Sequence, residues 1–211
     1  GDWEVQALLK ARPVAGSAAV RERVAGGIAA AFERVTSLPE QQRGEQVFAA
    51  VRELRARATQ LPAAGSDAVD VKSGVGGIRD AEFLVQGLQL VHLQRLPQLH
   101  TGNTLEALDL LADNSLLDAA QAAAIRDDYI FLRRVEHTLQ IFDDRQVHSL
   151  PAGEEALLAL SRQLFGPDAD RGRLEREVSG AMSRTRSHFD VITAPTVRSA
   201  PAVEGAAADD G

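Results

Sequence analysis

The sequence predicts an all-α protein, a bundle of seven or eight helices with a glycine-rich loop before the central helix. Apolar residues make up 45% of the chain but aromatic residues only 4%, so Leu, Val and Ala must form most of the core, which favours packed helices. Apolar residues recur every three to four positions in eight stretches, whereas alternating segments typical of strands are nearly absent. One stretch, residues 78–96, is apolar almost all round and therefore belongs at the centre of the bundle.

Helix-breaking and helix-capping residues set the expected boundaries. Proline cannot continue a helix, so Pro13, Pro62 and Pro97 each end one. Short polar side chains that accept hydrogen bonds from a first helical turn begin others, at Ser17, at Asn103 or Thr104, and at Asp118. The expected helices cover residues 3–12, 17–35, 38–60, 78–96, 104 onward, 118–142, 154–165 and 170–191.

These helices are expected to form one helical domain over residues 1–194. Within it, residues 1–62 hold the N-terminal helices and residues 72–194 form the main bundle, and a loop of small and polar residues joins the two parts. Residues 195–211 lack apolar periodicity and have too little apolar surface to offset the entropy of ordering them. A disordered tail is therefore expected there.

Charge and composition exclude several classes of function. A formal net charge of −7 argues against a general nucleic-acid binder and against binding to an anionic membrane. The chain has no cysteine, so disulfides and thiolate metal sites are excluded, and no apolar run is long enough to span a bilayer. Because no signal-peptide pattern opens the chain, a cytoplasmic location is expected.

Segment 71–83 carries the main motif. Three glycines lie within four positions directly before the central helix, between two cations: Lys72, Gly74, Gly76, Gly77 and Arg79. Unpaired N–H groups at a helix N-terminus, together with nearby cations, favour an anion site, here for phosphate. Only two of the 23 lysine and arginine residues are lysines, Lys10 and Lys72, and a compact ammonium can approach a phosphate closely. The alternative is a tight turn, capped by Asp80 and Glu82, at the start of a buried helix.

Polar side chains form a stripe on each of two helices. On the central helix, spacings of three, four and three place Arg79, Glu82, Gln86 and Gln89 on one face. The second stripe lies on helix 118–142. Unpartnered polar groups on a buried helix cost about 1–3 kcal/mol each, so the stripe of the central helix is expected either to face a cleft or to meet another polar stripe. The first alternative predicts a polar cleft. Its candidate residues are Glu82, Gln86, Arg133, Glu136, His137 and Gln140.

A solvated face is the alternative for the second stripe, with Arg133 paired to Glu136 or to His137. No second histidine lies three or four residues from His137, so no metal site is predicted there.

Several motifs together resemble one family, the glutamine synthetase adenylyltransferase/adenylyl-removing enzymes. The glycine motif Lys72-x-Gly74-x-Gly76-Gly77-Ile78-Arg79-Asp80-x-Glu82-Phe83 is similar to theirs. Further matches, in the same order and spacing, are Leu8-Leu9-Lys10-Ala11-Arg12, Thr104-Leu105, Tyr129-x-Phe131-Leu132-Arg133, Glu136-His137-x-Leu139-Gln140 and His148-x-Leu150-Pro151. Ala81 departs from the family, which has a larger aliphatic residue there. PII uridylyltransferases carry a similar glycine motif, but the later motifs resemble theirs less.

The resemblance implies the helical part of a bifunctional enzyme. Such an enzyme uses ATP and Mg²⁺ to adenylylate glutamine synthetase and removes the AMP by phosphorolysis. Each of its two halves joins a nucleotidyltransferase domain to a helical domain. Ile78-Arg79-Asp80 and Val135-Glu136-His137 look more like the N-terminal, adenylyl-removing half. The implied partners are glutamine synthetase, the PII regulator and the nucleotidyltransferase domain.

Such transferases hold magnesium with a Gly-Ser turn that is followed by an Asp-x-Asp pair on a strand, and the chain lacks this combination. Gly16-Ser17 and Gly65-Ser66 have no such pair after them, and Asp168-x-Asp170 is expected in a loop before a helix. No catalytic residue and no metal ligand is therefore predicted in this chain, and the isolated chain is expected to be inactive. Three roles stay open: a wall of the nucleotide cleft, an interaction module for glutamine synthetase or the PII regulator, and an unrelated structural bundle. The first role predicts that Lys72 and Arg79 face the same cleft as Gln86 and Gln140.

Overall fold

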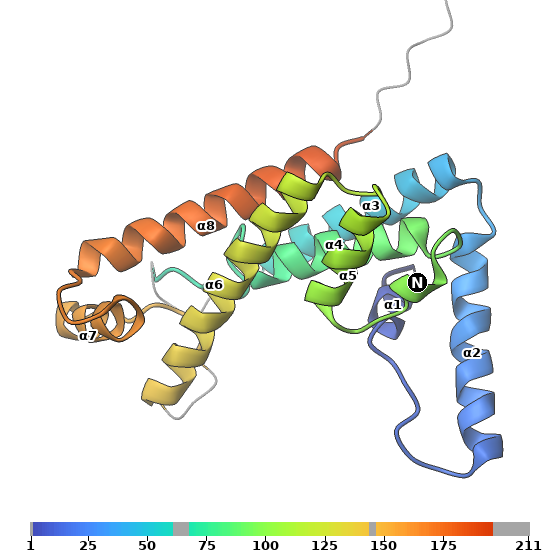
Figure 1. The fold of residues 1–211 in the computed structure, drawn as a ribbon, viewed down its shortest axis with the longest axis horizontal. Helices are drawn as coiled ribbons and strands as arrows, with labels where there is room; N and C mark the ends of the chain where they lie inside the picture. The colour runs from blue at the N-terminus through green and yellow to red at the C-terminus, as the bar shows by residue number, and fades with distance from the viewer. Residues whose placement is uncertain (1, 61–67, 144–146, 196–211) are drawn as a thin grey trace, which may run out of the picture.

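A computed structural model describes residues 2–60, 68–143 and 147–195 and confirms the all-α fold (Figure 1). These ranges contain eight α-helices, one short 3₁₀ helix (η1) and no β-strand. In chain order the elements are α1 (Asp2–Leu8), α2 (Ala18–Thr36), α3 (Glu40–Gln60), α4 (Ile78–His92), η1 (Pro97–Leu99), α5 (Thr104–Asp113), α6 (Ala119–Asp143), α7 (Glu154–Phe165) and α8 (Arg171–Ile192). The tail expected at 195–211 lies outside the described residues, apart from Pro195.

The predicted caps are present where the local chemistry requires them. The Ser17 side chain accepts from the Val20 N–H, and Asn103, rather than Thr104, caps α5 by accepting from the Leu105 N–H at 3.0 Å. Asp118 accepts from the N–H of Gln121 at 3.0 Å, at the start of α6. Because these contacts involve residues only two or three positions apart, the sequence alone was sufficient to predict them.

Two helices end earlier than their apolar patterns predict. α1 ends at Leu8 rather than at residue 12, because the following N–H groups bond three residues back and tighten the chain into turns. α4 ends at His92 rather than at residue 96, where the N–H groups of Arg95 and Leu96 both bond to the His92 carbonyl. Pro97 then opens η1 instead of ending α4 directly.

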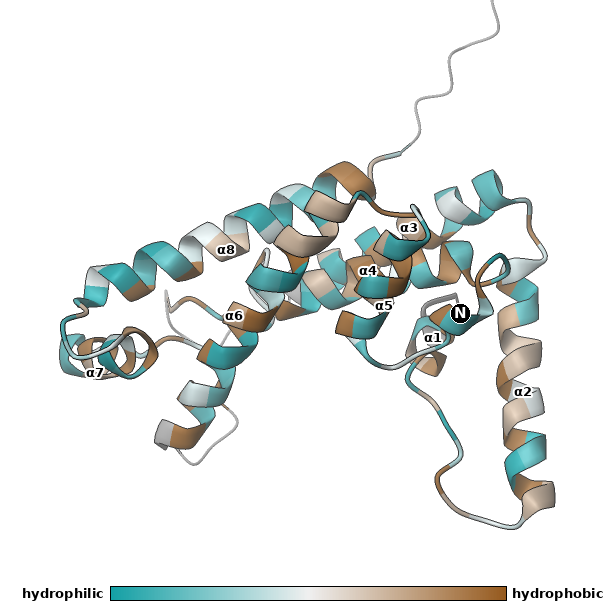
Figure 2. Cartoon of the chain, viewed as in Figure 1, coloured by the Kyte–Doolittle hydropathy of each residue, from teal (hydrophilic) through white to brown (hydrophobic). Residues whose placement is uncertain are grey.

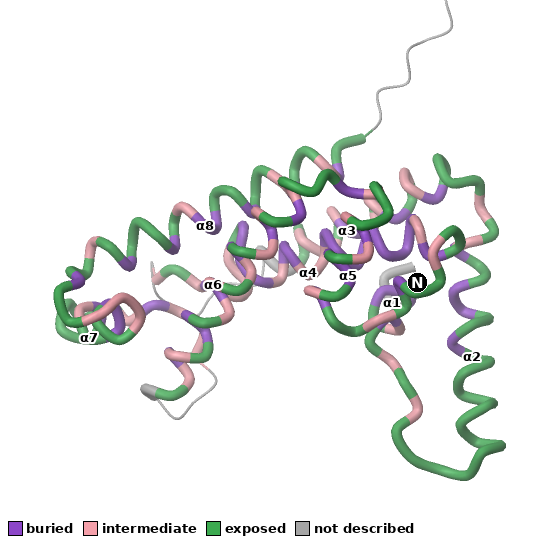
Figure 3. Tube along the Cα trace, viewed as in Figure 1, coloured by how far each residue is buried: buried purple, intermediate pink, exposed green. Residues whose placement is uncertain are grey.

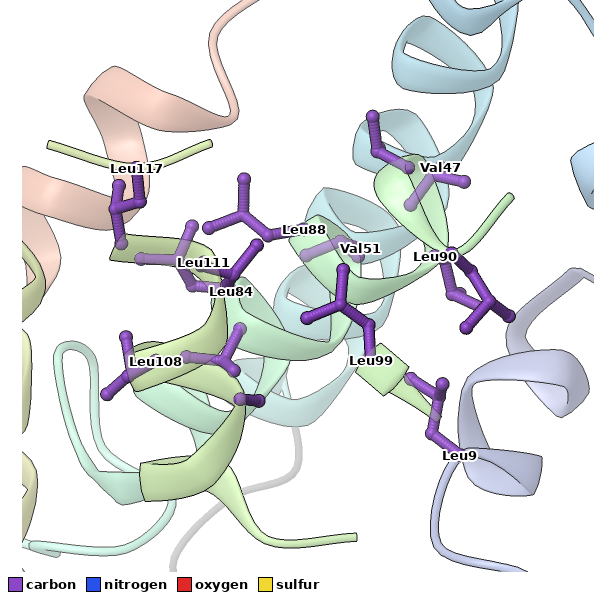
Figure 4. Close-up of a cluster of buried hydrophobic side chains, with 14 of the residues drawn as sticks. Leu9, Val47, Val51, Leu84, Leu88, Leu90, Leu99, Leu108, Leu111 and Leu117 are labelled. Atoms are coloured by element: carbon purple, nitrogen blue, oxygen red, sulfur yellow. The ribbon is translucent and has the colours of Figure 1, made fainter. Parts of the chain in front are cut away.

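α4 is the central helix, as its apolar sequence predicts. Eleven of its fifteen residues are buried, and α3, α5, α6 and α8 all pack against it. The larger hydrophobic core surrounds it, and Figure 4 shows leucines and valines of several elements meeting there. This core joins Leu9, Phe32 and Val51 to Leu84 and Leu108, so the packing runs across the expected division between residues 1–62 and 72–194.

A second hydrophobic core lies between α6, α7 and α8, where Leu132, Leu160 and Leu174 meet. α6 and α8 pack against each other, and each contributes to both cores. Hydrophilic and less polar residues alternate along α8 (Figure 2), as expected for a helix with one face in the core. The N-terminal half of α2 differs, because it is exposed on all sides (Figure 3). Within the described ranges, no helix is long and apolar enough to cross a membrane.

Candidate functional site

The glycine motif forms a tight turn against the end of a short bridge. Asp70 pairs with Ser149 in an isolated antiparallel bridge, and its carboxylate accepts from the N–H groups of Lys72 and Ser73, both at 2.8 Å. The Asp70 carbonyl also accepts from the N–H of Gly74 at 2.9 Å. These bonds fix the backbone at Lys72 to a segment that follows α6.

Glycine is required in this turn because the chain packs too closely for a side chain. Gly76 has a φ of +81°, and a Cβ there would lie 1.9 Å from the carbonyl oxygen of Met182 in α8. A Cβ at Gly74 would lie 2.3 Å from the Asp70 carbonyl, and one at Gly77 would lie 2.7 Å from that of Val71. The glycines therefore lock the turn between the bridge and α8.

The N–H groups of Gly76 and Gly77 already have acceptors within the chain. Gly76 donates to the Asp80 carboxylate at 2.7 Å, and Gly77 donates to the carbonyl of Gly74 at 2.9 Å. Asp80 therefore caps the turn, as the alternative interpretation predicts, whereas Glu82 makes other contacts. In this conformation an anion near the turn would have to bind side chains rather than these N–H groups.

Asp80 is held in a buried polar network. It is only 3% exposed, and the Arg55 Nε lies 3.1 Å from its Oδ2, while Nη1 of the same arginine contacts Asp190 at 2.6 Å. Burial raises the pKa of Asp80, against the opposing effects of the Gly76 N–H and the Arg55 charge. Arg55 thus links α3 and α8 to the glycine turn.

Glu136 is the centre of the second polar group, which we call the Glu136 cluster: Lys72, Arg133, Glu136, Gln140 and His148. The Glu136 side chain is 1% exposed. Its Oε1 lies 3.1 Å from the Lys72 Nζ and 3.2 Å from the His148 Nδ1, and its Oε2 accepts from the Arg133 Nη1 at 2.6 Å. Gln140 donates to Oε1 at a longer 3.4 Å. A buried carboxylate needs such partners, because an unpaired one would carry a large desolvation cost.

The cations of the Glu136 cluster reach the surface. The side chains of Lys72 and Arg133 are each 35% exposed, and each cation retains N–H groups that Glu136 does not use. Arg133 also contacts the exposed His137, with its Nη2 3.2 Å from the ring Nε2. The arrangement can therefore present two oriented cations, with a histidine on either side, to an anion outside the chain.

The polar stripe of α4 does not join this cluster. Glu82 contacts the Lys10 ammonium at 3.5 Å and the Tyr129 hydroxyl at 3.2 Å. Gln86 accepts from Gln6 at 2.9 Å inside the bundle. Arg79 is half-buried, and no side-chain partner is found for it among the described residues.

The structure therefore brings together Lys72, Arg133, Glu136, Gln140 and His137, but not Gln86 or Glu82. The prediction that one cleft would hold both stripes is wrong for Gln86, because Gln86 is buried and its amide oxygen accepts from Gln6 inside the bundle. Within the described ranges, no group of three or more histidine and carboxylate side chains is arranged to hold a metal ion.

Sequence reasoning missed three contributors to these sites. His148 lies in the motif His148-x-Leu150-Pro151, which is a signal for the residue but does not predict its contact with Glu136. Lys10 lies in the motif Leu8-Leu9-Lys10-Ala11-Arg12 and is one of only two lysines, but neither observation predicts its contact with Glu82. Arg55 carried no local signal at all, because its partner Asp190 is 135 residues away.

Comparison with known proteins gives one family and one group of relatives. The family described as GlnD PII-uridylyltransferase matches residues 46–193. This match covers the later motifs as well, so the likeness to PII uridylyltransferases extends further than the motifs indicated. Three relatives, each named bifunctional glutamine synthetase adenylyltransferase/adenylyl-removing enzyme, come from Xanthobacter autotrophicus, Streptomyces coelicolor and Xanthomonas campestris pv. campestris.

The identities to these relatives are 37%, 36% and 42%, over 80%, 90% and 72% of this chain. The same alignments cover only 17%, 18% and 16% of the relatives' own lengths, so the chain spans less than a fifth of each. The family match covers more than half of the chain and includes the glycine turn and every residue of the Glu136 cluster. The chain belongs to the GlnD PII-uridylyltransferase family, and it is similar there to one segment of the bifunctional glutamine synthetase adenylyltransferase/adenylyl-removing enzymes.

Proposed function

We propose that this chain is the helical part of an enzyme that regulates glutamine synthetase by ATP-dependent adenylylation and phosphorolytic deadenylylation. In this proposal the Glu136 cluster lies against the nucleotide or phosphate that a nucleotidyltransferase domain binds. The names of the relatives support glutamine synthetase as the substrate protein. The cations Lys72 and Arg133, each 35% exposed, support a role in binding the phosphate or nucleotide. The motifs Ile78-Arg79-Asp80 and Val135-Glu136-His137 favour the adenylyl-removing half.

The main observation behind this proposal is that Glu136 orients two cations, Lys72 and Arg133. Its carboxylate is buried on α6, so it cannot move far, and one oxygen contacts each cation. The backbone of Lys72 is also held in place, because its N–H donates a hydrogen bond to the Asp70 carboxylate. Cations that are oriented before a ligand arrives lose less entropy on binding, and they stabilise the charge of a phosphate without rearrangement.

Magnesium and ATP are assigned to the complete enzyme rather than to this chain. Phosphoryl transfer depends on positioning and on metal ions that neutralise the phosphates, and the sequence has no Asp-x-Asp pair after a Gly-Ser turn. The isolated chain is therefore proposed to be inactive in both directions. Within the complete enzyme, its part is to position an anion, not to form or break bonds.

Two neighbouring arginines of α6 provide a matched test in the complete enzyme. Arg133→Met removes a cation of the Glu136 cluster, whereas Arg134→Met removes an exposed cation one residue away. A lost hydrogen bond to a charged group costs about 1.5–3 kcal/mol, so Arg133→Met should weaken nucleotide or phosphate binding by about 10- to 100-fold. Arg134→Met should leave binding unchanged. Equal affinities for the two variants, with both still folded by circular dichroism, would contradict the proposal.

The alternative role is an interaction module for glutamine synthetase or the PII regulator. The observation that favours it is the exposed N-terminal half of α2, where Val20 and Val24 are 39% and 44% exposed. If this surface binds a partner, the double change Val20→Asp and Val24→Asp should abolish capture of glutamine synthetase or the PII regulator by the isolated chain. Arg133→Met should not change that capture. Failure of the chain to bind either protein would exclude this role.

A further inference from the structure

A polar pocket of about 890 Å³ is lined by Tyr129 but by no residue of the Glu136 cluster. Its base is formed by Glu82 of α4 and Tyr129 of α6, and its walls come from the loop after α1 and the loop between η1 and α5. This volume is in the range of pockets that hold small molecules. The loops also pack closely, since a Cβ at Gly102 would lie 3.4 Å from the Cα of Lys10.

Two cations face this pocket from the loop after α1, namely Lys10 and Arg12. Lys10 is 44% exposed and its ammonium lies 3.5 Å from Glu82, a long and loose ion pair. Arg12 is exposed, and no side-chain partner is found for it among the described residues. An ammonium and a guanidinium offer eight N–H donors between them, most of which have no acceptor here.

Both carboxylates that line the pocket already have partners within the chain. One oxygen of Glu82 faces Lys10 and the other accepts from the Tyr129 hydroxyl. The other glutamate of the lining, Glu106, accepts from the Thr101 hydroxyl at 2.6 Å. The unused hydrogen-bonding capacity of the pocket is therefore mainly that of donors, which suits a ligand rich in acceptors.

We propose that this pocket binds a small molecule through an oxyanion, a carboxylate or phosphate group, that bridges Lys10 and Arg12. Glu82 orients Lys10 through their ion pair, and the Tyr129 hydroxyl orients Glu82 by donating a hydrogen bond to its other oxygen. The pocket is lined by none of the residues of the Glu136 cluster, although Arg133 follows Tyr129 by one helical turn, or about 6 Å along α6. It uses none of the cluster's cations, so it does not depend on the proposed contact between the cluster and a nucleotide.

The presence of only two lysines allows a direct test on the 211-residue chain. The chain is acetylated with an uncharged reagent that reacts with amines, and mass spectrometry then reports the reactivities of Lys10 and Lys72 separately. The probes are millimolar inorganic phosphate and millimolar succinate, each at constant ionic strength against sodium chloride. We expect phosphate, succinate or both to slow the acetylation of Lys10 several-fold, because a bound oxyanion covers the ammonium. The probe that protects Lys10 identifies the ligand group.

Arg12→Met is the variant that tests the bridging arrangement, and Arg23→Met, an exposed arginine of α2, is its matched control. Protection of Lys10 should disappear in Arg12→Met and persist in Arg23→Met, with both variants folded by circular dichroism. Any protection of Lys72 by phosphate should be the same in both variants. Lys10 acetylation that neither probe slows, or protection equally strong in Arg12→Met, would overturn the proposal.

Discussion

The two lysines of the chain form two glutamate pairs that differ in burial. Lys72 pairs with Glu136 at 3.1 Å, and that carboxylate is 1% exposed and has three further partners. Lys10 pairs with Glu82 at 3.5 Å, and there the carboxylate is 25% exposed. The first pair is part of the packed structure, whereas the second is a rim contact. Burial rather than residue type therefore decides which pair the fold depends on.

The surroundings of the two lysine side chains differ in the same way. Lys72 precedes a glycine turn that packs tightly against α8, and its ammonium contacts a buried carboxylate. Lys10 follows the buried Leu9, but its own side chain is 44% exposed and contacts a partly exposed carboxylate. This difference suits the first pair to orienting a cation and the second to exchanging a partner.

The largest effect is expected from Gly76→Ala, which would break the locked turn. A Cβ at Gly76 would lie 1.9 Å from a backbone oxygen of α8, and the residue has a positive φ, so both strain and overlap oppose the change. We expect the free energy of unfolding to fall by more than about 3 kcal/mol, measured by urea denaturation. The control Gly26→Ala lies in α2 with nothing within 4 Å and should raise stability by up to about 1 kcal/mol. Similar melting temperatures for both variants would show that the turn is not locked.

A smaller loss in the free energy of unfolding is expected from Lys72→Met, and Lys10→Met is the variant to compare with it. Removing one partner of a fully buried pair costs about 3–5 kcal/mol, but Lys72 is 35% exposed and Arg133 still neutralises Glu136, so about 2 kcal/mol is expected. Lys10→Met should cost less than about 1 kcal/mol, because the pair it breaks is at the surface. Both losses in unfolding free energy can be measured by denaturant unfolding of the purified variants. Equal losses would remove the distinction between the two pairs.

The interaction between Lys10 and Glu82 should be weak and sensitive to salt. A double-mutant cycle of Lys10→Met and Glu82→Gln should give a coupling of about 0.2–1 kcal/mol at low ionic strength. At molar salt the coupling should vanish, because the Debye length is then only about 3 Å. The matched cycle of Lys72→Met and Glu136→Gln should keep most of its coupling. Salt-resistant coupling between Lys10 and Glu82 would mean that the pair is buried in solution.

The smallest effect concerns Tyr129, the only tyrosine of the chain, whose ionisation can be followed by phenolate absorbance. Burial, and then the charge of Glu82, raises the pKa of Tyr129 above its ordinary 10.0. Because the folded state holds this proton more tightly than the unfolded state, its contribution to stability is lost as pH rises through the window above 10. Glu82→Gln should lower the pKa of Tyr129 in the folded chain. A pKa that stays the same or rises in this variant would show that Glu82 does not act on the phenol.

The sequence by itself was sufficient for the fold class and for the number and order of the helices, although not for the ends of α1 and α4. Apolar periodicity and caps such as Asn103 and Asp118 depend on contacts between residues a few positions apart, so they can be read without knowing the fold. The three glycines before the apolar stretch likewise predict a turn at the N-terminus of α4. The motifs around that turn and along α6 indicated the glutamine synthetase adenylyltransferase/adenylyl-removing enzymes, and the comparison found relatives of that name. The wider match to the PII-uridylyltransferase family was not indicated by the later motifs.

Only the tertiary structure decided which polar residues meet. Glu82 and Gln86 share a face of α4 and contact Lys10 and Gln6, because α1 and the turn after it pack there. His148 reaches Glu136 through the bridge between Asp70 and Ser149, which joins segments far apart in the chain. Such contacts depend on how helices cross and on which carboxylate becomes buried, and no local pattern encodes either. The local interactions therefore determined the helices, while the packing determined the sites.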